Sequence, residues 1–385
     1  MATIFPDHIL LEQAQADAMI DRAIARLDRA MPDFQDAWPA PSSEDGMYPA
    51  IGNVEWTNGF WTGMLWLAWQ LRGEPRHRRA AARQIESFAD RVERRIAVDH
   101  HDLGFLYTLS CTAAWRLTSD PLARAAALDA AALLLSRYDP IATVIQAWGD
   151  MRDPKQRGRM IIDCNLNLPL LWWATAETGD ADYARAASAH VAQAARYLVR
   201  PDHSTFHTYY MNTETGAPCF GSTHQGFSDA SCWARGQAWG IYGFALAFRH
   251  TGDPAYLTLA GRLADYMLDR LPHDGICCWD LIFTGDEDVR DSSAAAIAAC
   301  GLLELAGFLP VSDAGRGRYA NAAVRMLVEL DRTYLAPEKG SNGILAHGVY
   351  HWPNGVGVDE CCIWGDYFYL EALMRVRSDW LPYWA

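Results

Sequence analysis

Several features that would assign this chain of 385 residues to a familiar class are missing from its sequence. No run of about 18 apolar residues is present, so the sequence predicts no membrane span. The start of the chain lacks a basic segment followed by an apolar run, so we expect no secretory signal. A G-x-G-x-x-G after a strand, a P-loop and a G-x-S-x-G are also absent. Their absence argues against nucleotide cofactors and a serine-hydrolase site.

Cysteine and charge narrow the choice further. The nine cysteines show no metal-ligand spacing such as C-x2-C, and most lie in apolar segments, where cysteine behaves as a small buried hydrophobe. We therefore expect reduced thiols in a cytoplasmic protein. The net charge of −14 disfavours a nucleic-acid partner, because phosphate binding needs a basic face. An anionic ligand would need a local arginine or lysine in its site.

What the sequence does contain is a pattern that repeats six times. Six apolar segments, rich in Ala, Leu and Trp, are apolar on all sides, which is typical of buried helices. Most of them end in turn residues such as Thr-Gly-Asp, which stop one helix and start the next. The six segments are 60–72, 103–117, 165–177, 232–250, 294–309 and 361–376.

Amphipathic segments with charged faces alternate with the apolar ones, at 10–30, 76–96, 122–138, 182–199, 254–271 and 313–334. They are interpreted as outer, half-solvated helices. Six hairpins of this kind predict an all-α fold, an (α/α)6 barrel that forms one domain over residues 1–385. Strands should be few, and the stretches 203–224 and 340–358 are expected to be loops or short hairpins.

Each predicted inner helix is preceded by polar residues. In a ring of parallel inner helices these starts meet at one end, so their side chains converge on one mouth. The polar stretches are 53–58, 99–102, Asp163, 224–229, 291–293 and 359–360.

Polar residues at helix starts also have a structural interpretation, because Asp and Ser are common helix caps. Capping is favoured for Asp291, Ser292 and Asp359. Asp102 and Asp163 instead stand in dense apolar stretches, which raise the pKa of a carboxyl group. Two such groups at one mouth could divide acid and base roles. The helix N-terminus favours the charged form, and the sequence leaves open which effect prevails.

Arg235 lies within an otherwise apolar predicted helix and must have a partner. The partner is either a buried carboxylate, such as Asp229, or the carboxylate of a substrate, which arginine binds in a bidentate manner. Several tryptophans lie near the same helix starts, where either core packing or sugar contact explains them. His100 and His101, with Asp99 and Asp102, suggest a metal, but no third histidine motif has matching spacing, so we expect none.

Five segments together resemble the unsaturated glucuronyl hydrolases of glycoside hydrolase family 88, and the resemblance covers nearly the whole chain. They read NVEWTNGFWTGMLWLAW, HHDLGFLYTLS, IIDCNLNLPLLWWA, HQGFSDASCWARGQAWGIYGFA and DSSAAAIAACGLLEL. The resemblance implies an (α/α)6 barrel without a metal or organic cofactor. It also implies release of a terminal uronic acid by hydration of its C4=C5 vinyl ether, a bond left by a polysaccharide lyase.

The resemblance further implies roles for individual residues. Asp163 would be the general acid and base, and Asp102 its partner. Arg235, Gln225 and Trp239 would hold the uronate carboxylate, while His207 and His224 would position water or substrate. The aromatic walls for the sugar rings would be Trp56, Phe60 and Trp148.

Alternatives remain at this point. A related family hydrolyses unsaturated rhamnogalacturonyl groups, but its fourth-helix motif is closer to RGNGW than to the Arg235-Gly236-Gln237 found here. A 2-epimerase of the N-acylglucosamine type shares the ring fold but needs histidine at the mouth, and only two inner helices are preceded by histidine. A binding module with a dead site is disfavoured by Asp102, Asp163 and Arg235. Some members of the family that this chain resembles accept sulfated fragments and carry Ser and Lys in the loop before the last helix. The loop 351–358 lacks both residues here, so the resemblance implies unsulfated substrates.

Overall fold

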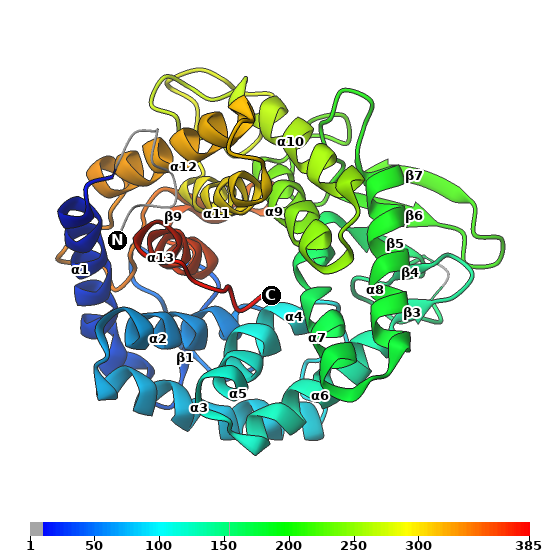
Figure 1. The fold of residues 1–385 in the computed structure, drawn as a ribbon, viewed down its shortest axis with the longest axis horizontal. Coiled ribbons are helices and arrows are strands. Elements are labelled where there is room, and N and C mark those ends of the chain that lie inside the picture. Colours follow the sequence, from blue (N-terminus) through cyan, green and yellow to red (C-terminus); the bar gives the residue numbers. More distant parts are fainter. Residues whose placement is uncertain (1–10, 154) are drawn as a thin grey trace.

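The computed structural model describes residues 11–153 and 155–385. Two concentric rings of helices form the fold, as Figure 1 shows. The described part of the chain is therefore an all-α (α/α)6 barrel, which confirms the predicted fold class. No helix in it is long and apolar enough to cross a bilayer.

The outer ring comes from the amphipathic segments. Its helices are α1 (Gln13–Ala30), α3 (Pro75–Glu93), α6 (Pro121–Ser136), α8 (Ala181–Gln193), α10 (Pro254–Leu268) and α12 (Ala314–Thr333). The predicted turn residues explain where several of them begin. The Asp253 carboxylate accepts the Ala255 N–H at the start of α10 and Asp120 does the same for Leu122 at the start of α6, as helix caps do.

The inner ring comes from the apolar segments, and most of its side chains are buried. It contains α2 (Asn58–Arg72), α4 (Leu103–Tyr107) with its continuation η2 (Thr108–Thr112) and α5 (Ala113–Thr118), η3 (Ile162–Leu166) with α7 (Pro169–Thr178), α9 (Ala234–Thr251), α11 (Ser292–Phe308) and α13 (Ile363–Arg377). Helix α9 ends at Gly252, whose φ of 70° requires the left-handed conformation that glycine adopts freely.

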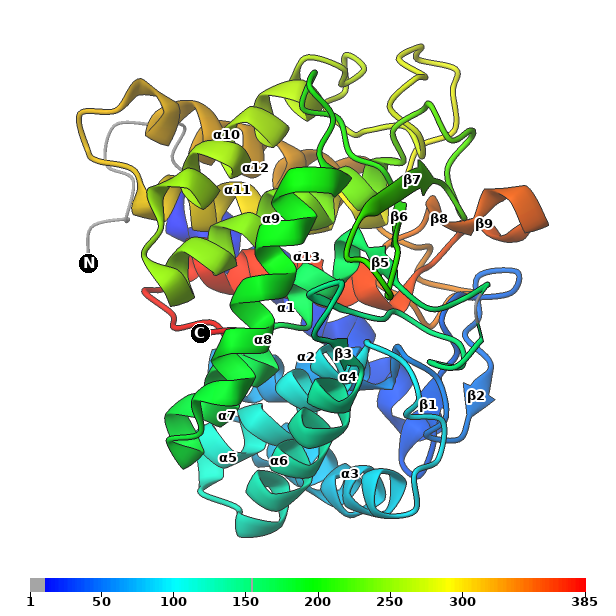
Figure 2. The ribbon, with the colours of Figure 1, turned by 90° about the vertical axis from the view of Figure 1, so that its right-hand side faces the viewer.

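Strands are few and short. The pairs are β1 (Trp38–Pro39) with β2 (Ala50–Ile51), β3 (Tyr138–Asp139) with β4 (Val144–Ile145), and β8 (Gly348–His351) with β9 (Val356–Glu360); β5 (Arg159–Ile161), β6 (Thr208–Met211) and β7 (Pro218–Ser222) form a three-stranded antiparallel sheet. The predicted hairpins at 203–224 and 340–358 are thereby confirmed. Figure 2 shows β5 to β9 toward one end of the barrel.

The last residues fold into the other end of the barrel, where Figure 1 places them inside the ring. Trp384 is fully buried, donates its indole N–H to Glu371 Oε2 at 2.8 Å, and lies parallel to Phe368 with ring centroids 6.1 Å apart. The C-terminal residues therefore pack against the inner helix α13 at this end of the barrel.

Of the three residues predicted to cap inner helices, only Asp291 does so. Asp291 does cap α11, because its carboxylate accepts the N–H groups of Ser293 and Ala294, whereas Ser292 is the first residue of the helix and donates its hydroxyl to Ala346 O at 2.7 Å. Asp359 does not cap the sixth inner helix. It lies in β9 with a φ of 62° and contacts His347 Nδ1 at 2.6 Å, because the hairpin continues to Glu360 and α13 begins only at Ile363.

Candidate active site

A cavity of about 220 Å³ lies among the starts of the inner helices. Helix starts, the three-stranded sheet and the β8–β9 hairpin all contribute to its wall. The lining residues are Trp56, His101, Asp102, Trp148, Asp163, His207, His224, Gln225, Trp233, Arg235, Trp239, Tyr350 and His351. Every predicted site residue except Phe60 is among them.

Phe60 lies beneath this wall instead of in it. Its side chain is fully buried, with its ring 6.1 Å from that of Trp56 and 5.3 Å from that of Phe105. Trp56 lies just before α2 and Phe60 lies in its first turn, and only Trp56 reaches the cavity.

A larger cavity of about 510 Å³ lies on the outer face between α1 and α3 and is lined by apolar residues and three arginines. The only carboxylate among its described lining residues, that of Asp28, is already engaged by Arg76 and His77, each at 2.7 Å. A pair of carboxylates is needed to divide acid and base roles, so the candidate active site is the smaller cavity at the mouth.

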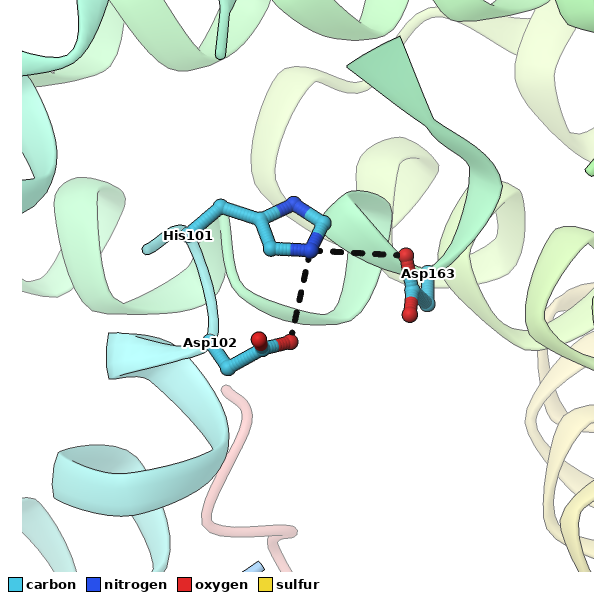
Figure 3. A group of neighbouring side chains, drawn as sticks. All are labelled: His101, Asp102 and Asp163. Carbon is cyan, nitrogen blue, oxygen red and sulfur yellow. Dashed lines mark ion pairs between the residues drawn. The ribbon is translucent and has the colours of Figure 1, made fainter. Parts of the chain in front are cut away.

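The two predicted catalytic carboxylates face one imidazole. His101 Nε2 lies 3.3 Å from Asp102 Oδ1 and 3.7 Å from Asp163 Oδ1, as Figure 3 shows. Asp163 Oδ1 is buried and makes no hydrogen bond with any described residue. A buried carboxyl oxygen without a partner is destabilised in its charged form, and a substrate or a bound proton can relieve this.

Local packing brings Asp102 and Asp163 together from different inner helices. The Phe105 N–H donates to Asn167 Oδ1 at 2.7 Å, which ties the start of α4 to the end of η3. This approach requires Gly104, because a Cβ there would lie 2.3 Å from the Asn167 Cα. The Gly of the HHDLGF motif therefore has a close-packing role.

The pKa values of the two carboxyl groups are shifted in opposite directions. Burial and the charge of Asp102 raise the pKa of Asp163 well above the ordinary carboxyl value, against the opposing charge of Arg235. Burial also raises the pKa of Asp102, but His101, His100 and Arg137 outweigh it, and the pKa lies below the ordinary value. The pair titrates as a unit and is arranged to hold one proton, which resides on Asp163.

The histidines of the cavity are neutral near pH 7. Burial lowers the pKa of His101 to about 4 and, together with His224 and Arg235, lowers the pKa of His207 well below its ordinary value. His207 Nδ1 accepts the backbone N–H groups of His224 and Gln225 at 3.0 and 3.2 Å. Its ring proton therefore resides on Nε2.

Arg235 is fixed from several sides. Its guanidinium donates to Val349 O, Tyr350 O and Gln225 Oε1 at 2.5, 2.9 and 2.5 Å. It also stacks between Trp233 and Trp364, 4.3 and 4.7 Å from the ring centroids. The expected carboxylate partner Asp229 does not face it; Asp291 does, at 3.7 Å.

Four lining residues, His101, Trp233, Tyr350 and His351, were not predicted as site residues. His101 adjoins Asp102, and Trp233 lies two residues before Arg235. A sequence of two adjacent histidines leaves open which of them points inward. Tyr350 and His351 lie in β8, and a strand of four residues carries too short a pattern to show which of its side chains faces the cavity.

The trio of His101, Asp102 and Asp163 also bears on metal binding. One ligand atom from each residue lies within 4.8 Å of the others, so the described residues could hold an ion. His and carboxylate ligands suit several divalent metals. The expectation of a metal-free site stays a prediction.

The chain is similar to known proteins over nearly its whole length. The family model described as Glycosyl Hydrolase Family 88 matches residues 28–305. An unsaturated chondroitin disaccharide hydrolase of Streptococcus pneumoniae is 46% identical over 377 residues, 97% of this chain and 95% of that protein. An unsaturated glucuronyl hydrolase of a Bacillus species is 45% identical over 367 residues, 95% of this chain and 97% of that protein. The crystal structure of an unsaturated glucuronyl hydrolase from Streptococcus agalactiae superposes with a TM-score of 0.95 at 44% identity, covering 99% of this chain and 96% of that one.

Proposed function

This chain belongs to glycosyl hydrolase family 88, and we propose that it releases a 4,5-unsaturated uronic acid from the non-reducing end of lyase-generated oligosaccharides. The substrate class is of the glycosaminoglycan or gellan type. Two related structures, each of a variant with one aspartate replaced by asparagine, support this choice. One, 42% identical, is complexed with dGlcA-GalNAc6S. The other, 44% identical, contains dGlcA-Glc-Rha-Glc.

The observation that carries the proposal is a pair of neighbouring carboxyl groups with opposite pKa shifts, beside a buried arginine. The raised pKa of Asp163 lets it hold a proton at a pH where an ordinary carboxyl group has lost it, while the lowered pKa of Asp102 keeps that group ionised. General acid catalysis requires a protonated group at the reacting atom. Arg235 supplies the cation that an anionic sugar needs in a protein of net charge −14.

The reaction then follows as a hydration. Asp163 donates its proton to C4 of the vinyl ether, and positive charge develops at C5 and the ring oxygen. Water adds at C5 and returns a proton to the Asp163 carboxylate. The hemiketal opens to a ketone by cleavage of the bond between C5 and the ring oxygen, and C1 releases the remaining sugar. Asp102, kept ionised, holds the ring hydroxyls.

The other lining residues bind the substrate. Arg235, Gln225 and Trp239 hold the uronate carboxylate, and His207 and His224 position the water. Trp56 and Trp148 lie against the sugar rings, because an indole face is apolar and its edge polar. Phe60 supports Trp56 from below. We expect no metal or organic cofactor to take part.

We propose in addition that residues 1–385 act as one catalytic domain in the cytoplasm. All nine cysteines are unpaired, and all but Cys219 are buried, which suits a reducing compartment. We propose that unsulfated fragments are preferred, because the loop 351–358 offers neither Ser nor Lys to a sulfate group. Faster turnover of a sulfated than of an unsulfated chondroitin disaccharide would contradict this preference.

Loss of the C4=C5 ultraviolet absorbance tests the activity directly, because hydration destroys the chromophore. Unsaturated disaccharides of chondroitin, hyaluronan and rhamnogalacturonan should be compared side by side. Decay with the first two is expected. Decay with the rhamnogalacturonan fragment alone would show that the activity is that of an unsaturated rhamnogalacturonyl hydrolase. No decay with any of the three would overturn the proposed function. The names of the relatives favour the expected outcome over the rhamnogalacturonyl and epimerase alternatives.

A further inference from the structure

Asp291 stands behind the cavity wall and does not line the cavity. Its carboxyl group is fully buried. Oδ1 accepts the Ser293 N–H at 3.0 Å, the Ser293 hydroxyl at 2.6 Å, and the N–H groups of Ala294 and Val349 at 3.3 Å each. Oδ2 has no hydrogen-bond partner among the described residues and faces Arg235 Nη1 at 3.7 Å. A cap needs only one of these oxygens, so the rest of the carboxylate serves something else.

The pair of Asp291 and Arg235 binds both backbone polar groups of Val349. Asp291 accepts its N–H, and Arg235 donates to its carbonyl oxygen. The next two residues of β8, Tyr350 and His351, line the cavity. The pair therefore fixes the strand that forms one wall of the site.

A second chain of contacts leads from Asp291 to the aromatic wall. Ser293 Oγ donates to Asp291 and accepts the indole N–H of Trp364 at 2.8 Å. Trp364 stacks on the Arg235 guanidinium and also on Trp56, with ring centroids 5.3 Å apart and planes at 24°. Trp56 lines the cavity, so two of its walls depend on the same carboxylate.

Among the described residues, Asp291 is the one carboxylate within ion-pair distance of Arg235. The other titratable groups near Asp291 are the thiols of Cys277 and Cys362, which burial and the Asp291 charge keep protonated by raising their pKa well above the ordinary value. Around Asp163 stand Asp102, Arg235, Cys164 and His101. Arg235 is thus the positive charge that links the two aspartates.

We propose that Asp291 is a positioning residue for the reaction: it clamps β8 and the Trp364 stack around Arg235, and its charge balances Arg235 so that Asp163 keeps its proton. This inference rests on the proposed function. Arg235 lowers the pKa of Asp163, and the carboxylate that faces Arg235 is that of Asp291, at 3.7 Å. Burial raises the pKa of Asp291, and the charge of Arg235 opposes this rise. Without that balance Asp163 would lose its proton at a lower pH, and turnover would fall on the alkaline side.

The deciding variant is Asp291→Asn, because asparagine caps helices as well as aspartate does and removes only the charge. The alkaline limb of the kcat profile should move by about one unit to lower pH, about tenfold in rate at a fixed pH on that limb. KM should not rise, since an unbalanced Arg235 attracts the uronate more strongly. A uniform loss at every pH, with a raised KM, would show a merely structural role and overturn the proposal.

Two companion variants keep the test decisive if Asp291→Asn folds poorly. Asp291→Glu restores the charge without the cap geometry, so the alkaline limb should return to the wild-type position while the thermal midpoint falls. Ser293→Ala cuts the link to Trp364 and keeps the charge, so KM should rise and the limb should stay. A limb that moves in Ser293→Ala, or that stays displaced in Asp291→Glu, would refute the charge-balancing role.

The control is Asp313→Asn, which alters the cap of α12, where the carboxylate accepts the Gly315 N–H at 2.8 Å on the exposed surface. It should leave both kcat and the limb unchanged. A carbon-13 titration of the Asp163 carboxyl group, assigned by its loss in Asp163→Asn, reports the same shift without any turnover. If the wild-type protein does not bleach the chromophore, the proposed function fails, while this titration still decides whether Asp291 sets the protonation of Asp163.

Discussion

Replacing Gly104 by alanine tests whether the two catalytic carboxylates depend on one close helix contact. A Cβ at this position would lie 2.3 Å from the Asn167 Cα and 2.6 Å from the Asn167 carbonyl oxygen, whereas ordinary contact begins near 3.4 Å. The start of α4 must therefore move away from η3 by about 1 Å, and the neighbouring atoms are backbone, which cannot turn aside. Asp102 and His101 would move away from Asp163 with it.

A displacement of about 1 Å costs about 100-fold in rate when it separates groups that must act together. Overpacking of this kind also destabilises by about 1–3 kcal/mol. We therefore expect kcat of Gly104→Ala to fall about 100-fold in the chromophore assay, while the protein still folds, as judged by its melting curve. The matched control is Gly307→Ala, because that glycine lies in α11 with no atom within 4 Å of a new Cβ. It should leave kcat unchanged. Wild-type activity in Gly104→Ala would refute the view that this contact sets the carboxylate geometry.

Four further outcomes are expected. Asp163→Asn should lower turnover by about 100-fold or more, as loss of a positioned acid does, with an unchanged melting curve; near wild-type turnover would remove Asp163 from the mechanism. Because the pKa of Asp163 is raised, its proton is present at low pH and is lost as the pH rises through that value, so kcat should decline on the alkaline side, and a flat alkaline profile would contradict the assignment. Arg235→Ala leaves Asp291 buried and unpaired, which costs about 3–5 kcal/mol, so calorimetry should show a lowered midpoint in addition to a raised KM; a raised KM alone would show that Arg235 serves only the ligand. Finally, dialysis against a chelator should not change the rate, and inhibition reversed by an added divalent metal would show that His101, Asp102 and Asp163 hold an ion.

The arrangement of the rings was predictable from the sequence because apolar periodicity reports burial directly. Segments such as 232–250, apolar on all sides, became inner helices, and the capping aspartates Asp120 and Asp253 mark the starts of outer ones. Details that depend on tertiary contacts were not predictable. Asp359 was expected to cap a helix, but its backbone adopts a positive φ in β9, which continues two residues beyond the predicted end of the hairpin at 358 and pairs with β8.

The candidate site was likewise predictable in part. Nearly all predicted residues converge on one cavity because parallel inner helices bring their starts together. Phe60, predicted from the family resemblance as a wall of the site, is instead fully buried behind Trp56, because a resemblance of motifs does not show how deep a side chain lies. The partner of Arg235 was expected to be either a buried carboxylate, such as Asp229, or the carboxylate of a substrate. The structure supplies Asp291 instead, because adjacent inner helices α9 and α11 lie side by side in the ring.

The opposing effects on the carboxyl groups are settled by what faces each of them. Asp102 and Asp163 both lie at helix starts, and burial raises the pKa of both. Asp102 is approached by His100 and His101, with Nδ1 of the former 3.2 Å from its Oδ2. Asp163 has Asp102 as a neighbour and an oxygen without a hydrogen bond to any described residue. Asp102 is thus kept ionised by its partners, and its charge adds to burial, the larger effect, in keeping Asp163 protonated.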